Sequence, residues 1–480
     1  MTTTRSAEKP PLYSIDRIPP EGLDIVAPGK YVVTNDVTWS PPVVGKGKTE
    51  THAAIRIACS HVLLDMGGHT LTCRGLRLHD TLCIGVAVLP VLQHEPLLDV
   101  QVVHGTVQNF SAYGVFIAGV HAVRVSDVHV QGLRNANLTH TSIGIFLAGC
   151  DGVRMRDCTC TNSRVRSKAH SGIQLLLCTN VAISNVEVSR QYNAAGGSVG
   201  LALVASRLAS ISRVRVANMS AGAELAPGSS GNTCVGVFLY LSAAATLSRV
   251  TVTNIHGSCD DSHGISVFVC PQHVLVSECS ASNVTTGFLS PSKSGAKATG
   301  VEVIAATDVA VSDCVATFIS ALSPQDKQVA GFSSGFTWHV SFTNCTASNC
   351  SVENGGAASG AEDREAHAHA RGVGFGWGPD PRPLFIKPSV YTVYSNCIAT
   401  RCDIAFDLFM HQHARLTNCF SKHCAIALND VSDETRVLRC NACSECDPPL
   451  TTTIKNKGNN NVGRARIAFP GPSNSKRKLQ

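Results

Sequence analysis

The sequence predicts an all-β solenoid, a parallel β-helix of about twelve coils with about three short strands in each. Three observations predict this fold. A glycine-led unit recurs along the chain, apolar residues alternate with a period of two inside each unit, and no helical apolar stripe runs through Val102–Ile319. Such alternation is typical of strands, and segments this short bury their apolar face only by stacking on a neighbouring copy.

The repeated unit is clearest at Gly144–Ser163. In seven units a glycine is followed thirteen residues later by a turn residue, whereas successive glycines lie 28 to 36 residues apart. The glycines that open these units, together with Gly264, whose unit is one residue longer, are Gly114, Gly144, Gly172, Gly200, Gly236, Gly264, Gly300 and Gly331. Because only the remainder of each coil varies in length, we expect the loops to emerge along one edge of the stack.

Two columns of equivalent residues follow from this alignment. The position expected to face the interior is occupied by small apolar residues, namely Val128, Cys158, Val186, Val214, Val250, Cys279, Cys314, Cys345, Cys397, Cys419 and Cys440. The preceding turn position is held by Asp127, Asp157, Asn185, Arg213, Arg249, Glu278, Asp313, Asn344, Asn396, Asn418 and Arg439. Cysteine packs as a small hydrophobe, and Asp and Asn tolerate sharp turns, so the sequence predicts a cysteine ladder inside and an amide ladder at Asn344, Asn396 and Asn418.

The opening coil carries a recognisable pattern. Ile55 and Ile57 are followed by Val62, Leu64 and then a turn, Asp65–Thr70, which reads DMGGHT. This pattern resembles the first rung of the pectin-lyase-like superfamily, and the resemblance covers roughly residues 31–446. It implies a right-handed parallel β-helix, a fold that carries lyases, hydrolases, esterases, epimerases, tailspikes and structural proteins.

The chain divides into three parts. Residues 1–50 are Pro-rich and are expected to cap the open end of the solenoid, where bare strand edges invite aggregation. Residues 51–446 form the β-helix domain, interrupted by a long inserted loop at 351–389 that is rich in Gly and charge. Residues 447–480 end in SKRKLQ and are expected to be a flexible basic tail.

Composition narrows the possible partners. The net charge of +6 over 480 residues is modest and does not argue for a nucleic-acid groove. No apolar run reaches the roughly 18 residues of a transmembrane helix, and Met1–Pro20 shows no signal peptide. Twenty-one cysteines without a signal peptide favour reduced thiols, and therefore an intracellular reducing compartment or a virion. β-helix rods are often trimers, so a homo-oligomer is compatible with the sequence.

The first candidate for chemistry is the run Asp260, Asp261 and His263. Glycoside hydrolysis needs two carboxyl groups, one protonated as an acid and one ionised as a base or nucleophile. The His-Gly-Ile-Ser string at His263–Ser266 resembles a rung of polygalacturonases, although the other motifs of that family have no counterpart at matching positions. The alternative interpretation is a polar loop in which the Asp side chains cap a turn.

The second candidate is the column of residues expected to face outward beside the loops. Its proposed substrate-binding members are Phe116, Phe146, Gln174, Phe238, Ser266 and Glu302. Aromatic rings in register stack on sugar rings, and the polar members add hydrogen bonds, so the column suits an extended glycan. The alternative is that loops cover and bury the phenylalanines.

The sequence patterns that would indicate metal binding or lyase chemistry are weaker. His367 and His369 lie one residue apart after acidic residues, so a Zn²⁺ site there needs further converging ligands. Lyase chemistry needs a basic residue, often with a Ca²⁺ site; Lys293 and Lys297 lie in one variable loop, with no dense acidic cluster evident opposite them. The sequence therefore predicts no cofactor as its first expectation, with Zn²⁺ or Ca²⁺ as the alternative.

Two functions remain open. In the first, the chain is a β-helix rod that contacts a glycan or a partner protein through its loop-bearing edge, as a virion structural protein does. In the second, it is a polysaccharide-degrading hydrolase or lyase that uses Asp260, Asp261 and His263. Whether the protein is an enzyme is not decided by the sequence, because this fold carries both kinds of protein.

Overall fold

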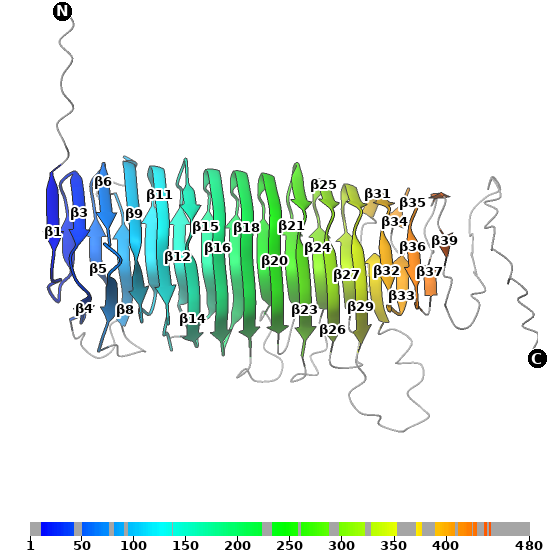
Figure 1. The fold of residues 1–480 in the computed structure, drawn as a ribbon, viewed down its shortest axis with the longest axis horizontal. Helices are drawn as coiled ribbons and strands as arrows, with labels where there is room; N and C mark the ends of the chain where they lie inside the picture. Colours follow the sequence, from blue (N-terminus) through cyan, green and yellow to red (C-terminus); the bar gives the residue numbers. More distant parts are fainter. Residues whose placement is uncertain are drawn as a thin grey trace, which may run out of the picture.

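The chain forms a rod of stacked strands that runs from the N-terminal to the C-terminal end of the described residues (Figure 1). The computed structural model describes residues 11–42, 50–75, 81–90, 95–136, 138–222, 233–257, 261–287, 297–321, 328–352, 371–376, 389–408, 411–424, 426–429, 436–438 and 441–442. All regular elements within these ranges are β-strands, and they belong to two sheets. The predicted parallel β-helix is therefore confirmed.

Sheet B receives one strand from each coil. Its strands are β2 (Leu23–Ile25), β5 (Glu50–Ile57), β8 (Thr81–Val88), β10 (Tyr113–Ala118), β12 (Thr141–Ala148), β15 (Ala169–Leu176), β17 (Gly197–Val204), β19 (Cys234–Tyr240), β21 (Ser262–Phe268), β24 (Lys297–Ile304), β27 (Gln328–Gly335), β30 (Arg371–Gly376), β33 (Ile404–Asp407) and β37 (Ile426–Asn429). Neighbours pair in parallel without a shift in register, as β17 does with β15 and β19. The described residues thus hold fourteen rungs, where about twelve were expected.

Sheet A forms the other two sides of each coil. Its first strands are β1 (Leu12–Ile15), β3 (Gly29–Val33), β4 (Val37–Trp39), β6 (Val62–Asp65), β7 (Thr70–Cys73), β9 (Leu97–Gln108), β11 (Val120–Gln131), β13 (Arg154–Arg156), β14 (Thr159–Val165), β16 (Thr179–Asn193), β18 (Arg207–Ala221) and β20 (Ala243–Gly257). Its later strands are β22 (Val274–Ser277), β23 (Ser280–Thr286), β25 (Thr307–Ser312), β26 (Val315–Ala321), β28 (Trp338–Thr343), β29 (Thr346–Val352), β31 (Ser389–Ser395), β32 (Ile398–Thr400), β34 (His411–Gln412), β35 (Arg415–Thr417), β36 (Phe420–Lys422), β38 (Arg436–Leu438) and β39 (Asn441–Ala442).

One extra rung lies in the segment expected as an irregular cap. Strand β2 pairs in parallel with β5, and β1 pairs with β3, so residues 11–42 already continue the stack. The capping role of residues 1–50 and the other segment boundaries stay predictions. Most of the insertion expected as a loop at 351–389 lies outside the described residues, but strand β30 within it pairs with β27 and β33 as a rung of sheet B, so that segment is not a loop throughout. Residues 443–480 also lie outside the described residues.

One large hydrophobic core runs through the rod from Ile15 to Cys424, and two small clusters of three buried residues each lie apart from it. The predicted interior column lies in it, and Val128, Cys158 and Val186 are at most 2% exposed. The later column members within the described residues are buried too, and every cysteine there is a free thiol. The cysteine side chains pack as small apolar groups, and Cys345 and Cys397 also donate weak hydrogen bonds to the backbone carbonyls of Val311 and Phe342.

The repeated glycines are required by the close approach of successive coils. A Cβ placed on Gly144 would lie 2.4 Å from the carbonyl oxygen of Gly172, and one on Gly200 would lie 2.5 Å from that of Gly236. A local bend at these glycines interrupts the alternation of sheet B: Ala298 and Val301, on either side of Gly300, both pack in the core, as do Cys234 and Val237 around Gly236. This bend positions the candidate site described below.

The predicted turn column is confirmed. Its described members have positive φ angles between 52° and 55°, the left-handed conformation that Asn and Asp tolerate best. Asn396 Nδ2 donates to Asn344 Oδ1 at 3.0 Å, and Asn418 Nδ2 donates to Asn396 Oδ1 at 3.3 Å. These bonds form the predicted amide ladder along one corner of the rod.

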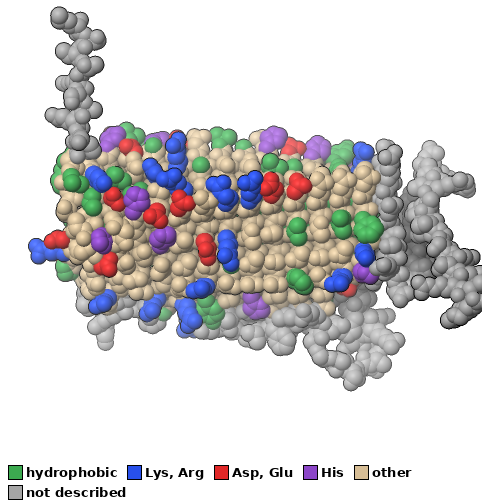
Figure 2. Space-filling model, in the orientation of Figure 1, with side chains coloured by type: hydrophobic (Ala, Val, Ile, Leu, Met, Phe, Trp, Pro, Cys, Tyr) green, Lys and Arg blue, Asp and Glu red, His purple; other side chains and the backbone are tan. Residues whose placement is uncertain are grey.

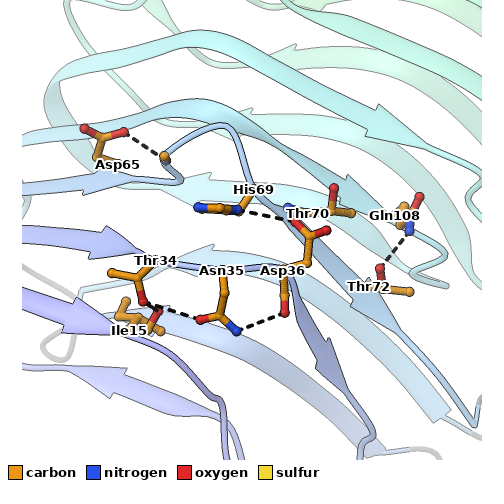
Figure 3. A network of polar contacts seen from close by, with 10 residues as sticks. Ile15, Thr34, Asn35, Asp36, Asp65, His69, Thr70, Thr72 and Gln108 are labelled. Atoms are coloured by element: carbon orange, nitrogen blue, oxygen red, sulfur yellow. Dashed lines mark hydrogen bonds and ion pairs between the residues drawn. The ribbon is translucent and has the colours of Figure 1, made fainter.

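The turn of the opening coil is held in a similar way. The Gly67 amide donates to Asp65 Oδ1 at 3.1 Å, which closes the turn within the rung. The Thr70 amide donates to Asp36 Oδ1 at 2.9 Å, and His69 Nδ1 lies 3.5 Å from the same oxygen (Figure 3). Asp36 belongs to the preceding coil, so the DMGGHT sequence joins two rungs.

Candidate functional site

The candidate site lies on the outer face of sheet B, on strands β21 and β24. Ile265 and Val267 of β21 face the core, whereas His263 and Ser266 face outward because the chain bends at Gly264 between them. In the parallel register His263 lies beside Thr299, and Ser266 lies beside Glu302. The aligned glycines of the repeat thus bring residues 36 positions apart into contact.

Glu302 is the centre of a buried polar cluster. Lys297 Nζ lies 2.6 Å from Glu302 Oε1, and Ser266 Oγ donates to Oε2 at 3.0 Å. His263 Nδ1 lies 3.4 Å from the same Oε2. The carboxylate is 3% exposed, and the three partners are at most 8% exposed. An isolated buried carboxylate is costly, and these partners offset the cost with an ion pair and a hydrogen bond.

Asp261 belongs to the same cluster. Its Oδ1 accepts a hydrogen bond from the backbone amide of Lys297 at 2.8 Å. Burial raises the pKa of Asp261 above its ordinary value, and the negative charge of Glu302 adds to this rise against the opposing attraction of His263 and Lys297. Asp261 therefore holds its proton more strongly than an exposed carboxyl group does.

The pKa of Glu302 shifts in the opposite direction from that of Asp261. Burial acts to raise its pKa, but attraction to His263 and Lys297, with the hydrogen bonds from Lys297 and Ser266, outweighs burial and leaves the pKa of Glu302 below its ordinary value. Two neighbouring carboxyl groups are thereby biased toward different protonation states. This pattern is the one that separates an acid from a base in catalytic sites, although structural ion pairs also produce it.

Two hydroxyl groups beside the cluster have no hydrogen-bond partner among the described residues. They are Thr299 Oγ1 and Ser333 Oγ, both fully buried. Thr299 pairs in register with His263, and Ser333 pairs with Glu302 on the next rung. Buried hydroxyls are normally bonded. These two are not the only exceptions among the described residues, since Ser262 Oγ, Ser198 Oγ and Ser421 Oγ also lack a partner.

Of the three predicted catalytic residues, the structure brings Asp261 and His263 together, and Asp260 lies outside the described residues. Lys297 was expected in a variable loop with no acidic partner evident, whereas it begins strand β24 and contacts Glu302. Alignment of Gly264 with Gly300 was the signal in the sequence that pairs these strands. It does not reveal which side chains converge, because that depends on the bend at each glycine.

The predicted substrate-binding residues form one column across sheet B. Phe116, Phe146, Gln174, Ala202, Phe238, Ser266 and Glu302 occupy equivalent positions on seven successive strands, β10 to β24. The phenylalanines and Gln174 are partly buried, and Ser266 and Glu302 are almost fully buried. Their role in binding stays a prediction.

Two groups of aromatic rings lie along this face. Near the N-terminal end, the Phe116 and Phe146 rings lie 5.4 Å apart and Tyr113 stacks on Phe146 at 5.7 Å. Next to the cluster, Phe238 and Tyr240 stack at 5.9 Å and Phe268 lies 5.8 Å from Tyr240. We call the second group the β19–β21 aromatic platform; Phe238 is the in-register neighbour of Ser266.

The metal hypothesis is not tested. His367 and His369 lie outside the described residues. Within the described ranges no group of three or more His, Cys, Asp or Glu side chains is arranged to hold a metal ion. The same ranges contain no helix with the length and hydropathy needed to cross a membrane.

Comparison with known proteins found similarity only among solved structures; no protein-family model and no curated protein sequence matches the chain. The A-module of mannuronan C-5 epimerase AlgE6 from Azotobacter vinelandii is 11% identical, with 92% of this chain and 90% of that chain covered and a TM-score of 0.36. A mutant tailspike protein of E. coli bacteriophage HK620, in complex with a pentasaccharide, is 12% identical, with coverages of 86% and 72% and a TM-score of 0.47.

A third similar structure is the periplasmic alginate epimerase AlgG. It is 9% identical, covers 87% of this chain and 79% of that chain, and has a TM-score of 0.35. These identities and TM-scores are too low to carry an argument about function. The function is therefore argued from the site alone.

Proposed function

We propose that the protein is a glycan-cleaving enzyme, a glycoside hydrolase that acts on an extended polysaccharide lying across the outer face of sheet B. The observation that carries this proposal is the cluster of Asp261, His263, Lys297 and Glu302, whose two carboxyl groups have pKa shifts of opposite sign. A parallel β-helix does not need charges on the outer face of a sheet, and burying an ion pair there gains little stability.

The roles follow from the protonation states. Asp261, whose pKa is raised, is the general acid that protonates the leaving oxygen. Glu302, kept ionised by Lys297 and hydrogen-bonded by Ser266, is the base or nucleophile. His263 lies against Glu302 and adds positive charge when protonated. Asp261 is the more accessible carboxyl group and marks the side from which substrate reaches the cluster.

The neighbouring surface suits a sugar chain. The β19–β21 aromatic platform offers partly exposed ring faces directly beside Ser266, and sugar rings stack on such faces. Thr299 and Ser333 offer hydroxyls that lack a partner on the other side of the cluster. Aromatic surface on one side and unsatisfied hydroxyls on the other are the two components of a glycan subsite.

A second candidate is binding without turnover, in which the chain is a rod that contacts a glycan or a partner protein, for example in a virion and as a trimer. One observation favours it. Glu302 is only 3% exposed and already has partners for both of its oxygens, as in a structural ion pair. In that case the cluster stabilises the rungs and the loop-bearing edge makes the contact.

A product assay separates the two candidates. Purified protein is incubated with galacturonan, alginate, xylan and mannan, and new reducing ends are measured together with ultraviolet absorbance, which reports the unsaturated product of a lyase. Hydrolysis that is lost in both Asp261→Asn and Glu302→Gln supports the proposal. The matched control is Glu278→Gln, which changes an exposed carboxylate paired with Arg249. Glycan binding without products from any polymer would show that the protein binds but does not cleave.

A further inference from the structure

A row of exposed rings lies at the corner between sheet B and sheet A. His339, Tyr391 and His413 occupy equivalent positions on three successive rungs, with φ angles of +56°, +59° and +53°. Their ring centroids lie 5.2 Å and 5.0 Å apart, and the Trp338 ring meets Tyr391 edge-on at 5.6 Å. We call these four residues the corner platform.

The fold does not account for these rings. Earlier rungs place Asn180, Leu208, Ala244, His273 and Asp308 at the same corner, all with positive φ. Single bulky residues therefore occur there, whereas His339, Tyr391 and His413 bring rings together on three successive rungs. Bulky residues are disfavoured there by about 1 kcal/mol each relative to Asn or Gly. Trp338 is 48% exposed and Tyr391 is 43% exposed, so their apolar surface is not used in the core. Exposed apolar residues scattered singly are normal, whereas a contiguous group of exposed rings is typical of an interaction site.

Polar groups border the platform. Asp308 Oδ1 lies 3.3 Å from His339 Nδ1, and both side chains are accessible. Histidine, acidic and hydrophobic side chains follow one another along the upper edge of the rod in Figure 2. Four rings offer far less area than the roughly 800 Å² that each partner contributes to a stable protein interface. Ring faces flanked by a carboxylate and imidazoles are instead suited to a sugar ring and its hydroxyls.

The platform lies close to the candidate active site along the chain. Asp308 follows Glu302 by six residues, around the corner from strand β24 to β25. Trp338 begins β28, which follows β27, the strand that pairs with β24. A glycan that leaves the outer face of sheet B at these rungs therefore passes over the corner.

We propose that the corner platform is a second glycan-binding site, separate from the Asp261–Glu302 cluster, that holds a distal part of the same polymer. The nature of the ligand rests on the proposed function, whereas the site itself rests on the exposed rings and their polar border. Trp338 and Tyr391 supply stacking faces, and Asp308 and His339 supply hydrogen bonds. The platform contributes affinity for long chains and takes no part in bond cleavage.

The test measures binding without turnover. Glu302→Gln protein is titrated by calorimetry with polymeric and short galacturonan, alginate, xylan and mannan. We expect Trp338→Ala and Tyr391→Ala each to weaken binding of the polymer about tenfold and to leave binding of short oligosaccharides unchanged. The control is Phe318→Ala, which removes another exposed aromatic residue in the left-handed conformation that lies at a different corner.

Three binding results would overturn the proposal. They are unchanged polymer affinity in both variants, an equal loss in Phe318→Ala, and failure of the parent protein to bind any of the four polymers. If Trp338→Ala changes the sedimentation coefficient and leaves the glycan affinity unchanged, the platform is an interface between copies of the chain. That result would also contradict the proposal. If Glu302→Gln retains wild-type hydrolysis, the proposed active site is wrong, while the affinity comparison still decides the corner platform.

Discussion

Lys297 and Glu302 form an ion pair of 2.6 Å although they lie five residues apart on one strand, β24. In a regular strand residues five apart point to opposite faces of the sheet. The bend at Gly300 removes this alternation, so that both side chains reach the outer face while Ala298, Val301 and Val303 face the core. Gly300 therefore has two roles: it allows the close packing of successive coils, and it brings the side chains of the candidate site together.

Replacing that glycine should disturb both stability and the site. A Cβ on Gly300 would lie 2.6 Å from Ala316 Cβ and 2.6 Å from the carbonyl oxygen of Gly331. We expect Gly300→Ala to lower the free energy of unfolding by at least about 2 kcal/mol, measured by urea denaturation. Gly149→Ala is the control: it has a positive φ but open space around its Cβ, so only the conformational cost of about 1 kcal/mol applies. Equal losses in the two variants would contradict the steric explanation.

Removing the ammonium group should leave Glu302 buried and uncompensated. We expect Lys297→Met to destabilise the protein by about 3 kcal/mol, because breaking a buried pair costs more than the pair itself contributes. The double variant Lys297→Met/Glu302→Leu should recover much of this loss, since the uncompensated charge of Glu302 is removed as well. Urea denaturation of the two variants measures the difference, and a double variant less stable than Lys297→Met would argue against this account.

The two carboxyl groups should affect the pH dependence of stability with opposite signs. The pKa of Glu302 is lowered in the folded state, so its contribution is present above the unfolded pKa of about 4.3 and is lost as pH falls. The pKa of Asp261 is raised, so ionising it above about pH 3.9 costs stability as pH rises. Glu302→Gln should therefore flatten the loss of stability in acid, and Asp261→Asn should stabilise the protein at neutral pH.

Thermal unfolding between pH 3 and pH 8, monitored by circular dichroism, checks both signs. The control is Glu278→Gln, whose carboxylate is paired with Arg249 at the surface. If Asp261→Asn destabilises the protein at neutral pH as much as Glu302→Gln does, the opposite assignment of the two carboxyl groups is wrong.

The amide ladder should contribute measurably at the corner of the rod. Asn396 donates to Asn344 and accepts from Asn418. We expect Asn396→Ala to cost about 1–2 kcal/mol, from two lost hydrogen bonds and the left-handed conformation forced on alanine. Asn396→Gly loses the same bonds without the conformational cost, so it should be the more stable of the two. Guanidinium denaturation of the wild type and both variants tests this account: Asn396→Gly as stable as the wild type would mean that the ladder bonds contribute nothing, and Asn396→Gly less stable than Asn396→Ala would contradict the conformational cost.

Much of the architecture could be predicted because it is determined by short-range periodicity in the sequence. The two-residue alternation and the constant distance from glycine to turn residue predicted the interior position of Val128 and Cys158 and the left-handed turns at Asp127 and Asn185. The ladder of Asn344, Asn396 and Asn418 followed from stacking equivalent positions. Strand β2 was missed because its three residues show too short an alternation to be distinguished from a loop.

The candidate site could be predicted only in part. The sequence predicted Asp261 and His263 as catalytic residues because they are close in the chain. It predicted Glu302 as a binding residue because it is a polar residue in an outward column. Their convergence with Lys297 was not evident, because a residue assigned to a loop has no expected neighbour. The corner platform was not predicted either, since Trp338 and Tyr391 lie 53 positions apart in the sequence.

The sequence by itself determined that the chain stacks into a parallel β-helix, which residues line its interior and where each coil turns, because these properties depend on a local pattern repeated in every rung. Only the tertiary structure decided that Lys297 neutralises Glu302, that Asp261 and Glu302 hold their protons differently and that rings gather at one corner. The physical reason is that a bend at each glycine and the register between coils set which side chains meet, and burial at that meeting point sets their charge.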